Sequence, residues 1–441
     1  MPELQELTLR QHATEIWQAA LVAAKPEPLV VRALNEFQSD IAKAKRILVV
    51  GAGKAGPAMA RGLEEALASC LGRVEGVVNV PADAVKPLRK IELHAGRPAG
   101  SNFPAAEGVA GAERMLALLS GTDADNVAIC LLSGGGSALL PAPPEDVSLA
   151  DKEATTKVLH ACGARINEMN AVRKHLSRIK GGRLAQAFRG RKLITLIISD
   201  VVGDPLDVIA SGPTAADPTT FADAIDVLGR YKLWPKVPES VRRHLERGQA
   251  GEIPETLKQV PANVVNRIIG GNADALAAAQ AKAQALGYQV LNLGSFIEGD
   301  TQQVAIACAG IVRGIQAGEV SVFQPACVLL GGETTVALSE NSGKGGRNQE
   351  FVLAMLCKLG EAQMQNVAIL SGGTDGEDGP TNAAGAIGSA QSWANARKQH
   401  LRPQDHLARH DAYPVFAATG DLFHTGPTET NVMDVRVLLV R

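Results

Sequence analysis

The stretch Arg46-Ile-Leu-Val-Val-Gly-Ala-Gly-Lys-Ala-Gly56 joins an apolar, β-branched run directly to a turn that is rich in glycine. An apolar run bounded by glycine predicts a buried strand of a parallel sheet. Glycine just beyond such a strand lets backbone N–H groups approach an anion, and the next helix N-terminus adds positive potential. The stretch therefore predicts an α/β fold with a candidate anion site at the end of this strand.

Three later stretches have the same form, an apolar run that ends in a glycine-rich turn carrying polar groups. They are residues 128–137 (AICLLSGGGS), 327–335 (CVLLGGETT) and 367–380 (VAILSGGTDGEDGP). A single turn of this kind is weak evidence for a ligand. Four of them, with a lysine in the first and two aspartates in the last, favour a site that handles phosphate.

Apolar runs alternate with helical patterns along the chain, which indicates βαβ units. A chain of 441 residues is too long for one ordinary core. Four prolines around a charged helix at 232–262 favour a domain boundary or linker there. We therefore expect two doubly wound, mostly parallel α/β domains, a Rossmann-like one at 1–255 and a second at 256–441, with an active-site cleft between them.

The pattern also sets the elements that we expect. The expected helices are 6–25, 57–70, 272–286, 301–317 and 347–359. The expected strands are 46–50, 76–80, 127–132, 193–198, 264–269, 289–293, 326–330, 366–370 and 433–440.

Composition excludes several classes of function. A formal charge of −2 gives no long-range attraction for nucleic acid or acidic membranes, and 3% aromatic residues provide no base-stacking platform. No apolar stretch is long enough to span a membrane, and no signal peptide is evident. The six scattered cysteines favour reduced thiols. We expect a cytoplasmic protein, monomer or homodimer, that binds small molecules.

The first glycine-rich turn resembles a dinucleotide fingerprint but lacks its second requirement. Gly51, Gly53 and Gly56 match the pattern GxGxxG, yet the next strand ends at 78–81 without an acid that would bind a ribose hydroxyl. Lys54 lies inside the loop, where its ammonium would meet a phosphate directly. The alternative is a surface lysine on a tight turn.

The next two turns each allow a structural alternative. Ser133 and Ser137 flank three glycines, so N–H and O–H donors can converge on an anion; the alternative is a flexible turn that serves only packing. Glu333 is equally suited to a ligand role and to capping a helix. Asp200 follows the strand at 193–199, at the edge where active-site groups collect, and a structural cap is the alternative.

Charged residues elsewhere suggest further contacts. Arg173 and Lys174 belong to a basic helix that ends at a Gly-Gly pair; they form either a solvated face or a site for a carboxylate or phosphate. Arg347 lies near a helix start, where the dipole disfavours a cation, so a bound anion would explain it. Asp375 and Asp378 would suit Mg²⁺ that bridges substrate phosphates, and a polar turn is the alternative.

Several long motifs resemble those of one family, the glycerate 2-kinases whose C-terminal half is called the MOFRL domain. The resemblance runs in order from about residue 8 to the C-terminus. Its motifs are Gly51-Ala-Gly-Lys-Ala-Gly, Leu132-Ser-Gly-Gly-Gly-Ser-Ala-Leu, Arg173-Lys-His-Leu-Ser, Lys180-Gly-Gly-Arg-Leu-Ala, Ser199-Asp-Val-Val-Gly-Asp, Gly331-Gly-Glu-Thr, Gly345-Gly-Arg-Asn-Gln-Glu and Ser371-Gly-Gly-Thr-Asp-Gly-Glu-Asp-Gly-Pro-Thr.

The resemblance implies ATP-dependent phosphorylation of D-glycerate to 2-phosphoglycerate, with Mg²⁺. It places a lysine and an arginine at the reacting phosphate, here Lys54 and Arg347, and an acid near the substrate, here Asp200. Some relatives are labelled hydroxypyruvate reductase, so an NAD(P)H-dependent oxidoreductase is the rival. We expect metal contacts from Asp375 and Asp378. The substrate or nucleotide contacts that we expect are Gly53, Ser133, Gly134, Gly135, Gly136, Ser137, Arg173, Lys174, Gly332, Glu333, Asn348, Thr374, Asp375 and Thr381.

Overall fold

A computed structural model describes residues 2–101, 103–339 and 341–441 of the chain. The chain forms two compact units, each assembled from separate segments. Unit 1 comprises residues up to 25, 200–203 and 270–441, and unit 2 comprises 26–199 and 204–269. Within the described ranges, no helix is both long and apolar enough to cross a membrane.

Unit 2 is built on a six-stranded sheet with the strand order β3-β2-β1-β4-β5-β6, which is the order of dinucleotide-binding folds. The pairs from β3 to β5 are parallel. Every residue of β4 is buried, as expected of a central strand in a parallel sheet. The strands are β1 (Arg46–Ala52), β2 (Val74–Pro81), β3 (Ile91–Arg97), β4 (Asn126–Leu132), β5 (Lys192–Ile198) and β6 (Val264–Gly270).

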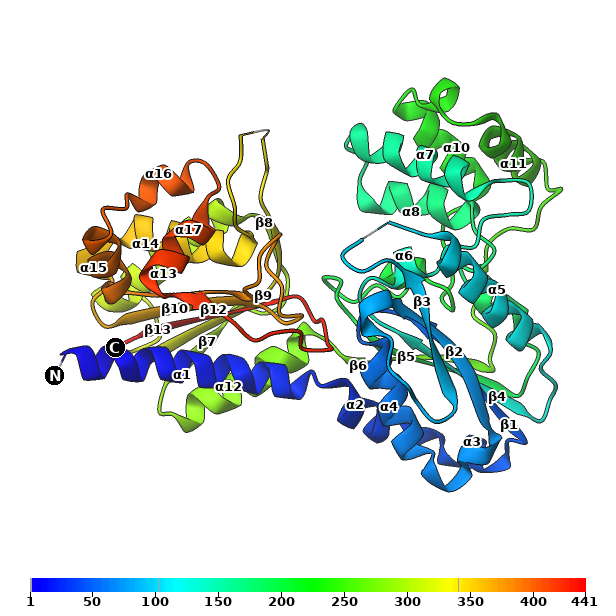
Figure 1. The fold of residues 1–441 in the computed structure, drawn as a ribbon, viewed down its shortest axis with the longest axis horizontal. Coiled ribbons are helices and arrows are strands. Elements are labelled where there is room, and N and C mark those ends of the chain that lie inside the picture. The colour runs from blue at the N-terminus through cyan, green and yellow to red at the C-terminus, as the bar shows by residue number, and fades with distance from the viewer. Residues whose placement is uncertain (1, 102, 340) are drawn as a thin grey trace. The chain divides into compact units, whose positions relative to one another are not determined.

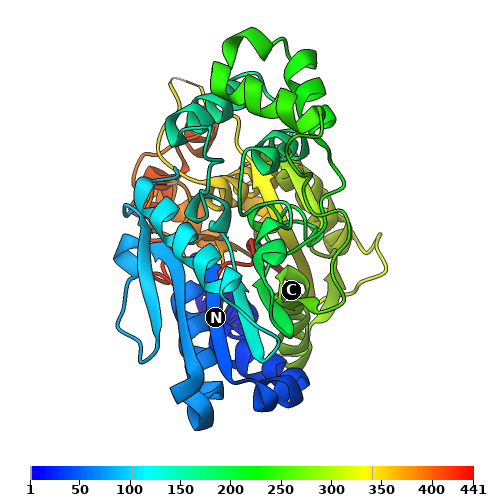
Figure 2. The same ribbon diagram turned by 90° about the vertical axis from the view of Figure 1, so that its right-hand side faces the viewer.

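Helices of unit 2 divide into those around the sheet and a separate helical group. The first set is α2 (Pro26–Leu34), α3 (Gln38–Lys43), α4 (Gly56–Ala66), α5 (Ala106–Ser120), α6 (Gly136–Leu139) and α9 (Arg183–Ala187). The helical group is α7 (Leu149–Ala161), α8 (Ile166–His175), α10 (Phe221–Arg230) and α11 (Glu239–Gln249), which Figures 1 and 2 show together at one end of unit 2.

The segment at 232–262, predicted as a boundary or linker, is instead part of this helical group. Val237, Val241 and Leu245 are buried in the apolar cluster that Phe221 and Leu228 also form. The compact units divide at 269/270 rather than at the predicted 255/256, because β6 belongs to the sheet of unit 2. The charged composition of α11 reflects its one solvated face.

Unit 1 contains a mixed sheet rather than the mostly parallel one that we expected. The order is β12-β11-β10-β13-β9-β7, with β8 also paired to β9. β13 runs antiparallel to both β9 and β10, whereas β7 and β8 run parallel to β9. The strands are β7 (Gln289–Asn292), β8 (Ile297–Asp300), β9 (Ala326–Thr335), β10 (Val367–Gly373), β11 (Gly385–Ser389), β12 (Leu422–Phe423) and β13 (Asp434–Val440).

Two layers of helices cover this sheet (Figure 1). On one side α1 (Pro2–Ala23) and α12 (Asn272–Ala285) pack against each other and the sheet, and α13 (Thr301–Ala317) and α14 (Arg347–Gln363) form the main core on the other. The smaller helices are α15 (Ala390–Lys398), α16 (Pro403–Leu407) and α17 (Ala412–Thr419).

The N-terminal helix α1 therefore belongs to the unit formed by the C-terminal half of the chain, outside the predicted 1–255 domain. Its Trp17 is fully buried, and the indole Nε1 donates to Gly372 O at 3.3 Å. The Trp17 ring also packs edge-on against Phe423, with ring centroids 4.9 Å apart. An amphipathic helix that buries a tryptophan in this way closes one face of the sheet.

Candidate active site

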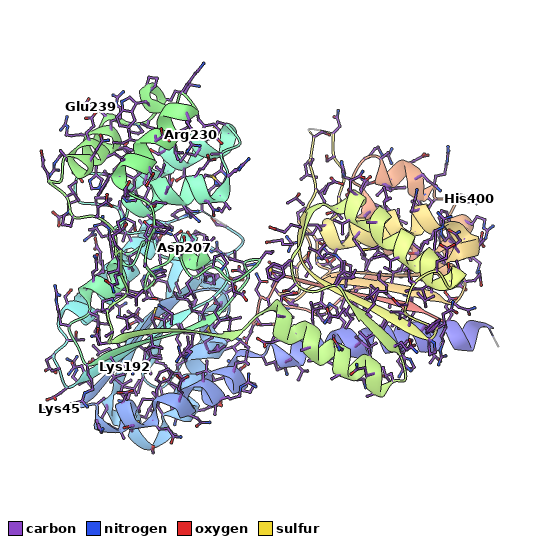
Figure 3. All side chains as sticks on the ribbon, turned by 180° about the vertical axis from the view of Figure 1, so that it is seen from behind. Lys45, Lys192, Asp207, Arg230, Glu239 and His400 are labelled. Atoms are coloured by element: carbon purple, nitrogen blue, oxygen red, sulfur yellow. The ribbon has the colours of Figure 1, made fainter. Side chains whose placement is uncertain are left out.

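Strands β1 and β4 are neighbours in the sheet of unit 2, and the connections that follow them leave in opposite directions. This arrangement is the switch point at which ligands bind in open α/β sheets, just beyond the carboxyl ends of the strands. Figure 3 shows Asp207 towards this end of unit 2, with Lys45 and Lys192 at the opposite end. The loops after β1 and β4, which contain Lys54 and residues 133–137, lie at the switch point.

The backbone N–H groups of the loop after β1 donate to acceptors of the protein itself. The four bonds are Gly53 N to Asn79 O (3.2 Å), Lys54 N to Gly134 O (2.8 Å), Ala55 N to Ser133 Oγ (3.1 Å) and Gly56 N to Gly53 O (3.1 Å). A dinucleotide pyrophosphate needs such N–H groups at the ligand. The GxGxxG loop therefore lacks the donors of a dinucleotide site, and the side chain of Lys54 in this loop is half-buried.

The loop after β4 divides into a structural part and a part suited to an anion. Ser133 is buried, and its hydroxyl accepts the Ala55 N–H, so it ties the two loops together. Gly135 adopts a left-handed conformation (φ 76°) close to the Lys54 side chain. Among the described residues, the N–H groups of Gly134 and Gly135 have no hydrogen-bond acceptor. Gly136 N, by contrast, donates to Ser133 O. Of the backbone donors of the predicted anion site, the N–H groups of Gly134 and Gly135 could therefore bind an anion.

Ser137 lies at the centre of a cationic cluster. Its Oγ accepts from Arg173 Nη2 at 2.5 Å and from Lys180 Nζ at 2.6 Å, and it lies 3.0 Å from Ser211 Oγ. Lys180 is 1% exposed, and Arg173 is half-buried. The basic segment after Asn170 is therefore turned inward, not a solvated face. Burial, followed by the charge of Arg173, holds the pKa of Lys180 well below its ordinary value.

Lys174 has a structural environment. Its side chain is 2% exposed, and its Nζ lies 3.0 Å from Asp207 Oδ2 and 3.2 Å from Asp217 Oδ1. Two carboxylates thus compensate its charge, as a buried ammonium requires. Of the two candidates for a substrate carboxylate, Lys174 is thus already paired with acids of the protein.

In unit 1, Arg347 starts α14 and is held by carboxylates of the protein. Its Nε and Nη2 donate to the two oxygens of Asp434 at 2.7 and 3.0 Å, and Nη1 lies 2.9 Å from Glu333 Oε1. Burial alone would lower the pKa of Arg347, but the charge of Asp434 and these bonds raise it. The predicted need for an anion beside this cation is met by Asp434, whereas burial raises the pKa of Glu333.

Asp434 and Arg436 are charged residues beside Arg347 that the sequence did not lead us to expect. Both are fully buried, although they belong to the otherwise apolar strand β13. Arg436 Nη2 donates to Asp434 Oδ2 at 3.0 Å, and its guanidinium stacks over Phe351 at 4.9 Å. Burial opposes ionisation of Asp434, but Arg347 and Arg436 lower its pKa. The sequence signal that could have identified them is the presence of two charged residues in an otherwise apolar strand.

The carboxylate of Asp378 caps helix α14. Its two oxygens accept Asn348 N at 2.9 Å and Gln349 N at 2.8 Å. Burial raises the pKa of Asp378 to about 7, against the effect of these two N–H groups. The Asn348 amide is equally engaged, because Nδ2 donates to Asp434 Oδ1 at 2.9 Å and Oδ1 accepts from Ser371 Oγ at 2.5 Å.

The remaining predicted residues of unit 1 mainly organise loops. Thr374 Oγ1 donates to Met433 O at 2.7 Å, and Thr381 Oγ1 donates to Asp378 O at 2.8 Å. Gly332 (φ 128°) lets β9 pair closely with β8. Asp375 is half-buried, and its Oδ1 accepts Glu377 N at 3.1 Å. Across the described part of the chain, no group of three potential metal-ligating side chains is found.

A pocket of about 320 Å³ opens beside Arg347 within unit 1. Its volume is in the range of small-molecule sites. Its walls combine hydroxyl, aliphatic, glycine and charged groups, among them Thr335, Val336, Leu338, Gly346, Glu350 and His410. His410 Nδ1 lies 2.8 Å from Glu350 Oε1, which fixes that carboxylate at the pocket wall.

Asp200 follows β5 and belongs to unit 1. Its Oδ2 lies 3.4 Å from Asn431 Nδ2, a donor of the loop before β13. The contact therefore connects Asp200 to the loop that leads into β13, the strand that begins with Asp434. Its predicted catalytic role stays a prediction, as does the predicted ligand cleft between the two halves of the chain.

Comparison with known proteins gives matches along nearly the whole chain. The domain of unknown function DUF4147 matches residues 12–246, and the MOFRL family matches residues 326–434. A glycerate 2-kinase of Pyrococcus horikoshii is 40% identical over 397 residues, 90% of this chain and 87% of its own. A putative hydroxypyruvate reductase of Agrobacterium vitis is 40% identical over 99% of this chain and 95% of its own.

A solved structure agrees with these matches. The crystal structure of a glycerate kinase from Thermotoga maritima superposes with a TM-score of 0.86 at 33% identity, covering 98% of this chain and 100% of that one. The resemblance predicted from the motifs is thereby confirmed, and the chain belongs to the family that combines a DUF4147 domain with a MOFRL domain and includes glycerate kinases.

Proposed function

We propose that this protein is a glycerate 2-kinase, which transfers the γ-phosphoryl group of ATP to the C2 hydroxyl of D-glycerate. The observation that carries the proposal is the switch point of unit 2. It presents the Lys54 side chain and an inward-facing group of cations in place of the backbone cradle of a dinucleotide. Cations suit a transferred phosphoryl group and a carboxylate substrate. The names of the relatives point the same way.

Phosphoryl transfer depends on positioning and on charge stabilisation more than on covalent chemistry. We assign Lys54 and Arg347 to stabilising charge on the transferred phosphoryl group. Arg347 suits this role because three of its N–H donors bind Asp434 and Glu333, while the two others of its five remain. Its carboxylate partners fix the guanidinium before a ligand arrives. The N–H groups of Gly134 and Gly135 supply further donors at the other site.

The substrates take separate places in this proposal. Arg173 binds the carboxylate of D-glycerate, and Asp200 orients or deprotonates its hydroxyl group. The pocket beside Arg347 receives the nucleotide, whose base would lie against Val336 and Leu338.

Magnesium fits only part of the predicted residue set. Asp378 is engaged in capping α14, whereas Asp375 offers a half-buried carboxylate on the turn after β10. Mg²⁺ commonly uses one or two carboxylates together with substrate phosphates, so Asp375 would hold it. The ion would neutralise charge on the phosphates. Cytoplasmic location is part of the same proposal, since ATP is its substrate.

The test uses purified protein with D-glycerate, ATP and Mg²⁺, and follows ADP and the phosphorylated product. We expect ADP to appear in step with 2-phosphoglycerate. The rival reductase function, suggested by the name of the Agrobacterium vitis relative, predicts NADH oxidation with hydroxypyruvate. Steady NADH oxidation without ADP formation would rule out the kinase.

A further inference from the structure

Unit 2 buries more positive charge than its acids compensate. Lys152, Lys174 and Lys180 are each at most 5% exposed, and Arg173 is half-buried beside them. The carboxylates of this region, Asp207 and Asp217, both pair with Lys174. Among the described residues, no carboxylate forms an ion pair with Lys152, Arg173 or Lys180. Buried charges without an ion-pair partner are costly, so this excess calls for an explanation.

Lys152 is the most exceptional member of this cluster. It lies on α7 with its side chain buried, and in the described structure its Nζ has no hydrogen-bond partner. Helix α7 packs against α8, the helix that carries Arg173, so the cations belong to neighbouring elements. Consistent with this packing, Arg173 lowers the pKa of Lys152, and both lower the pKa of Lys180. Burial is the larger cause in each case. An ammonium that pays such a desolvation cost without a partner is typical of a binding site.

Two hydroxyl groups stand among the cations. Ser137 Oγ accepts from both Arg173 and Lys180, so the two cations converge on one hydroxyl oxygen. Ser211 Oγ lies 3.0 Å from Ser137 Oγ, and Ser211 has a positive φ of 62°. Its neighbour Ala210 also has a positive φ, of 50°. Strained non-glycine residues cluster at functional sites, where they hold side chains in place.

We propose that Lys152, Arg173 and Lys180, with the hydroxyls of Ser137 and Ser211, form a binding site for the carboxylate of a small hydroxy acid. The ligand supplies the negative charge that this cluster lacks. The identification of the acid as D-glycerate rests on the proposed function. Lys152 and Lys180 are added to Arg173 as binding residues, and Lys174 is excluded because Asp207 and Asp217 already pair with it.

The short distance along the chain between Ser137 and the glycine that lies against Lys54 suits a small acid. Gly135, two residues before Ser137, lies against the Lys54 side chain. Two residues of chain span at most about 7 Å. A carboxylate at Ser137 would therefore place the hydroxyl groups of a three-carbon acid near Lys54.

The test measures ligand-induced thermal stabilisation and kinetics in two variants and one control. Lys152→Met and Lys180→Met remove the cations, and Lys157→Met changes an exposed lysine on the same helix α7. For wild type and the control, we expect millimolar D-glycerate to raise Tm and glycerol, which lacks the carboxylate, to leave it unchanged. A ligand that binds only the folded state stabilises it.

For Lys152→Met we expect the Tm of the ligand-free protein to rise and the affinity for D-glycerate to fall. The apo variant should melt higher than wild type because a buried, unpaired charge is removed. D-Glycerate should then give a smaller Tm shift, and KM for D-glycerate should rise roughly 10- to 100-fold, the value of one or two charge-assisted hydrogen bonds. KM for ATP should stay unchanged. Lys180→Met should likewise raise KM for D-glycerate, so the result does not depend on one variant.

Three outcomes would overturn the inference. A lower apo Tm with normal KM for D-glycerate in Lys152→Met would make the lysine structural. A rise in KM for ATP alone would place a nucleotide phosphate at the cluster. A D-glycerate Tm shift that survives in both variants would place the carboxylate elsewhere. Absence of kinase activity in wild type would refute the proposed function alone, because the Tm shift reports the anion site without turnover.

Discussion

At the scale of single residues, the candidate site contrasts two ways of presenting a cation. Arg347 is surrounded by carboxylates that keep it charged and fix its orientation. Lys152 and Lys180 have been taken out of water beside other cations. A cation held by carboxylates, such as Arg347, is already oriented and can stabilise charge without moving. Buried cations that lack an acid, such as Lys152 and Lys180, suit a site where a bound anion neutralises them.

Lys54 and Arg347 are expected to act on the transition state more than on substrate binding. Lys54→Ala and Arg347→Ala should each lower kcat by about 10²- to 10³-fold, as loss of one charge-stabilising donor does. Steady-state kinetics with D-glycerate and ATP provide the measurement. Near-normal turnover in either variant would remove that residue from the chemical step.

The double variant tests whether the two residues serve the same step. Residues that act together are non-additive, so its kcat should fall by less than the product of the two single effects. Strict multiplicativity would mean that each acts independently. Because Lys54 and Arg347 are both partly exposed, circular dichroism should show folded protein in all three variants.

Lys152 predicts a pH dependence of stability. Burial lowers its pKa from 10.5 to about 7, so between these values the unfolded chain binds a proton that the folded chain does not. Stability that depends on Lys152 therefore increases as pH rises from 7 towards 10.5, by up to about 5 kcal/mol at 1.4 kcal/mol per pKa unit. Arg173 and Lys180 are the charged neighbours that also disfavour its protonation.

Denaturation of wild type and Lys152→Met across this pH range is the measurement. The stability advantage of the variant should be greatest below pH 7 and should shrink as the solution becomes alkaline. A constant difference at all pH values would show that Lys152 does not titrate in this range.

Sequence reasoning could select candidate segments, but it could not foresee the contacts that their residues make. It selected Lys54, Arg347 and the 133–137 turn because glycine and charge at strand ends are local signals. It assigned Asp378 to a metal and a bound anion to Arg347, because the contacts of Asp378 with Asn348 and of Arg347 with Asp434 join distant positions. Lys152 on a polar helix carries no local signal at all.

At the scale of elements, the start of α14 determines what the turn after β10 can do. Asp378 accepts the first free N–H groups of the helix, which is the usual function of an acid at a helix N-terminus. A carboxylate used in this way contributes to stability, whereas Asp375 on the same turn remains the candidate for Mg²⁺.

Replacing each aspartate by asparagine separates the two roles. Asp375→Asn should raise the Mg²⁺ concentration needed for half-maximal activity and leave Tm unchanged. Asp378→Asn should lower stability by about 1 kcal/mol, the value of a helix cap, with an ordinary Mg²⁺ requirement. Mg²⁺ titrations and thermal melts measure both. An unchanged Mg²⁺ titration in Asp375→Asn would mean that Asp375 has only a structural role in its turn.

The junction of β1 and α4 depends on the absence of a side chain at Gly53. Its φ is 148°, and a Cβ there would lie 2.0 Å from Ser133 Oγ. Gly53→Ala should therefore lower Tm and activity together, because the β1 and β4 loops must separate. Gly72→Ala is the control, since a Cβ at Gly72 meets nothing within 4 Å. Equal melting curves for both variants would contradict the close packing of the loops.

The fold was predictable where strands are long and apolar. All nine expected strands correspond to strands of the structure, while β3, β8, β11 and β12 were not expected. β11 (GAIGS) and β12 (LF) are short or rich in glycine, so no periodicity marks them. The antiparallel pairing of β13 with β9 and β10 was missed because the direction of a strand is not encoded in its own apolar residues.

At the scale of the whole molecule, the units do not follow the order of the chain. Unit 2 is formed by residues 26–269 apart from 200–203, whereas unit 1 combines the first helix with the C-terminal half. Trp17 provides the test of this arrangement. Trp17→Ala should destabilise unit 1 by roughly 3–5 kcal/mol, the cost of truncating a buried aromatic side chain.

Chemical denaturation followed by limited proteolysis measures this effect unit by unit. Fragments of unit 1 should be cut at lower denaturant concentration in Trp17→Ala than in wild type, and fragments of unit 2 should be cut as before. Leu7→Ala is the matched control, because Leu7 lies on the exposed face of the same helix. Equal loss of protection in both units would contradict the division.

The central place of β13 in the sheet of unit 1 has a consequence for protein synthesis. This strand lies between β9 and β10, and it reaches Val440. During synthesis, residues 26–269 can complete unit 2 early, while α1 must wait with its apolar face uncovered until β13 emerges. The chain therefore passes through a period in which an early helix and a half-formed sheet coexist with a finished unit 2, and unit 1 becomes whole only after β13 has been made.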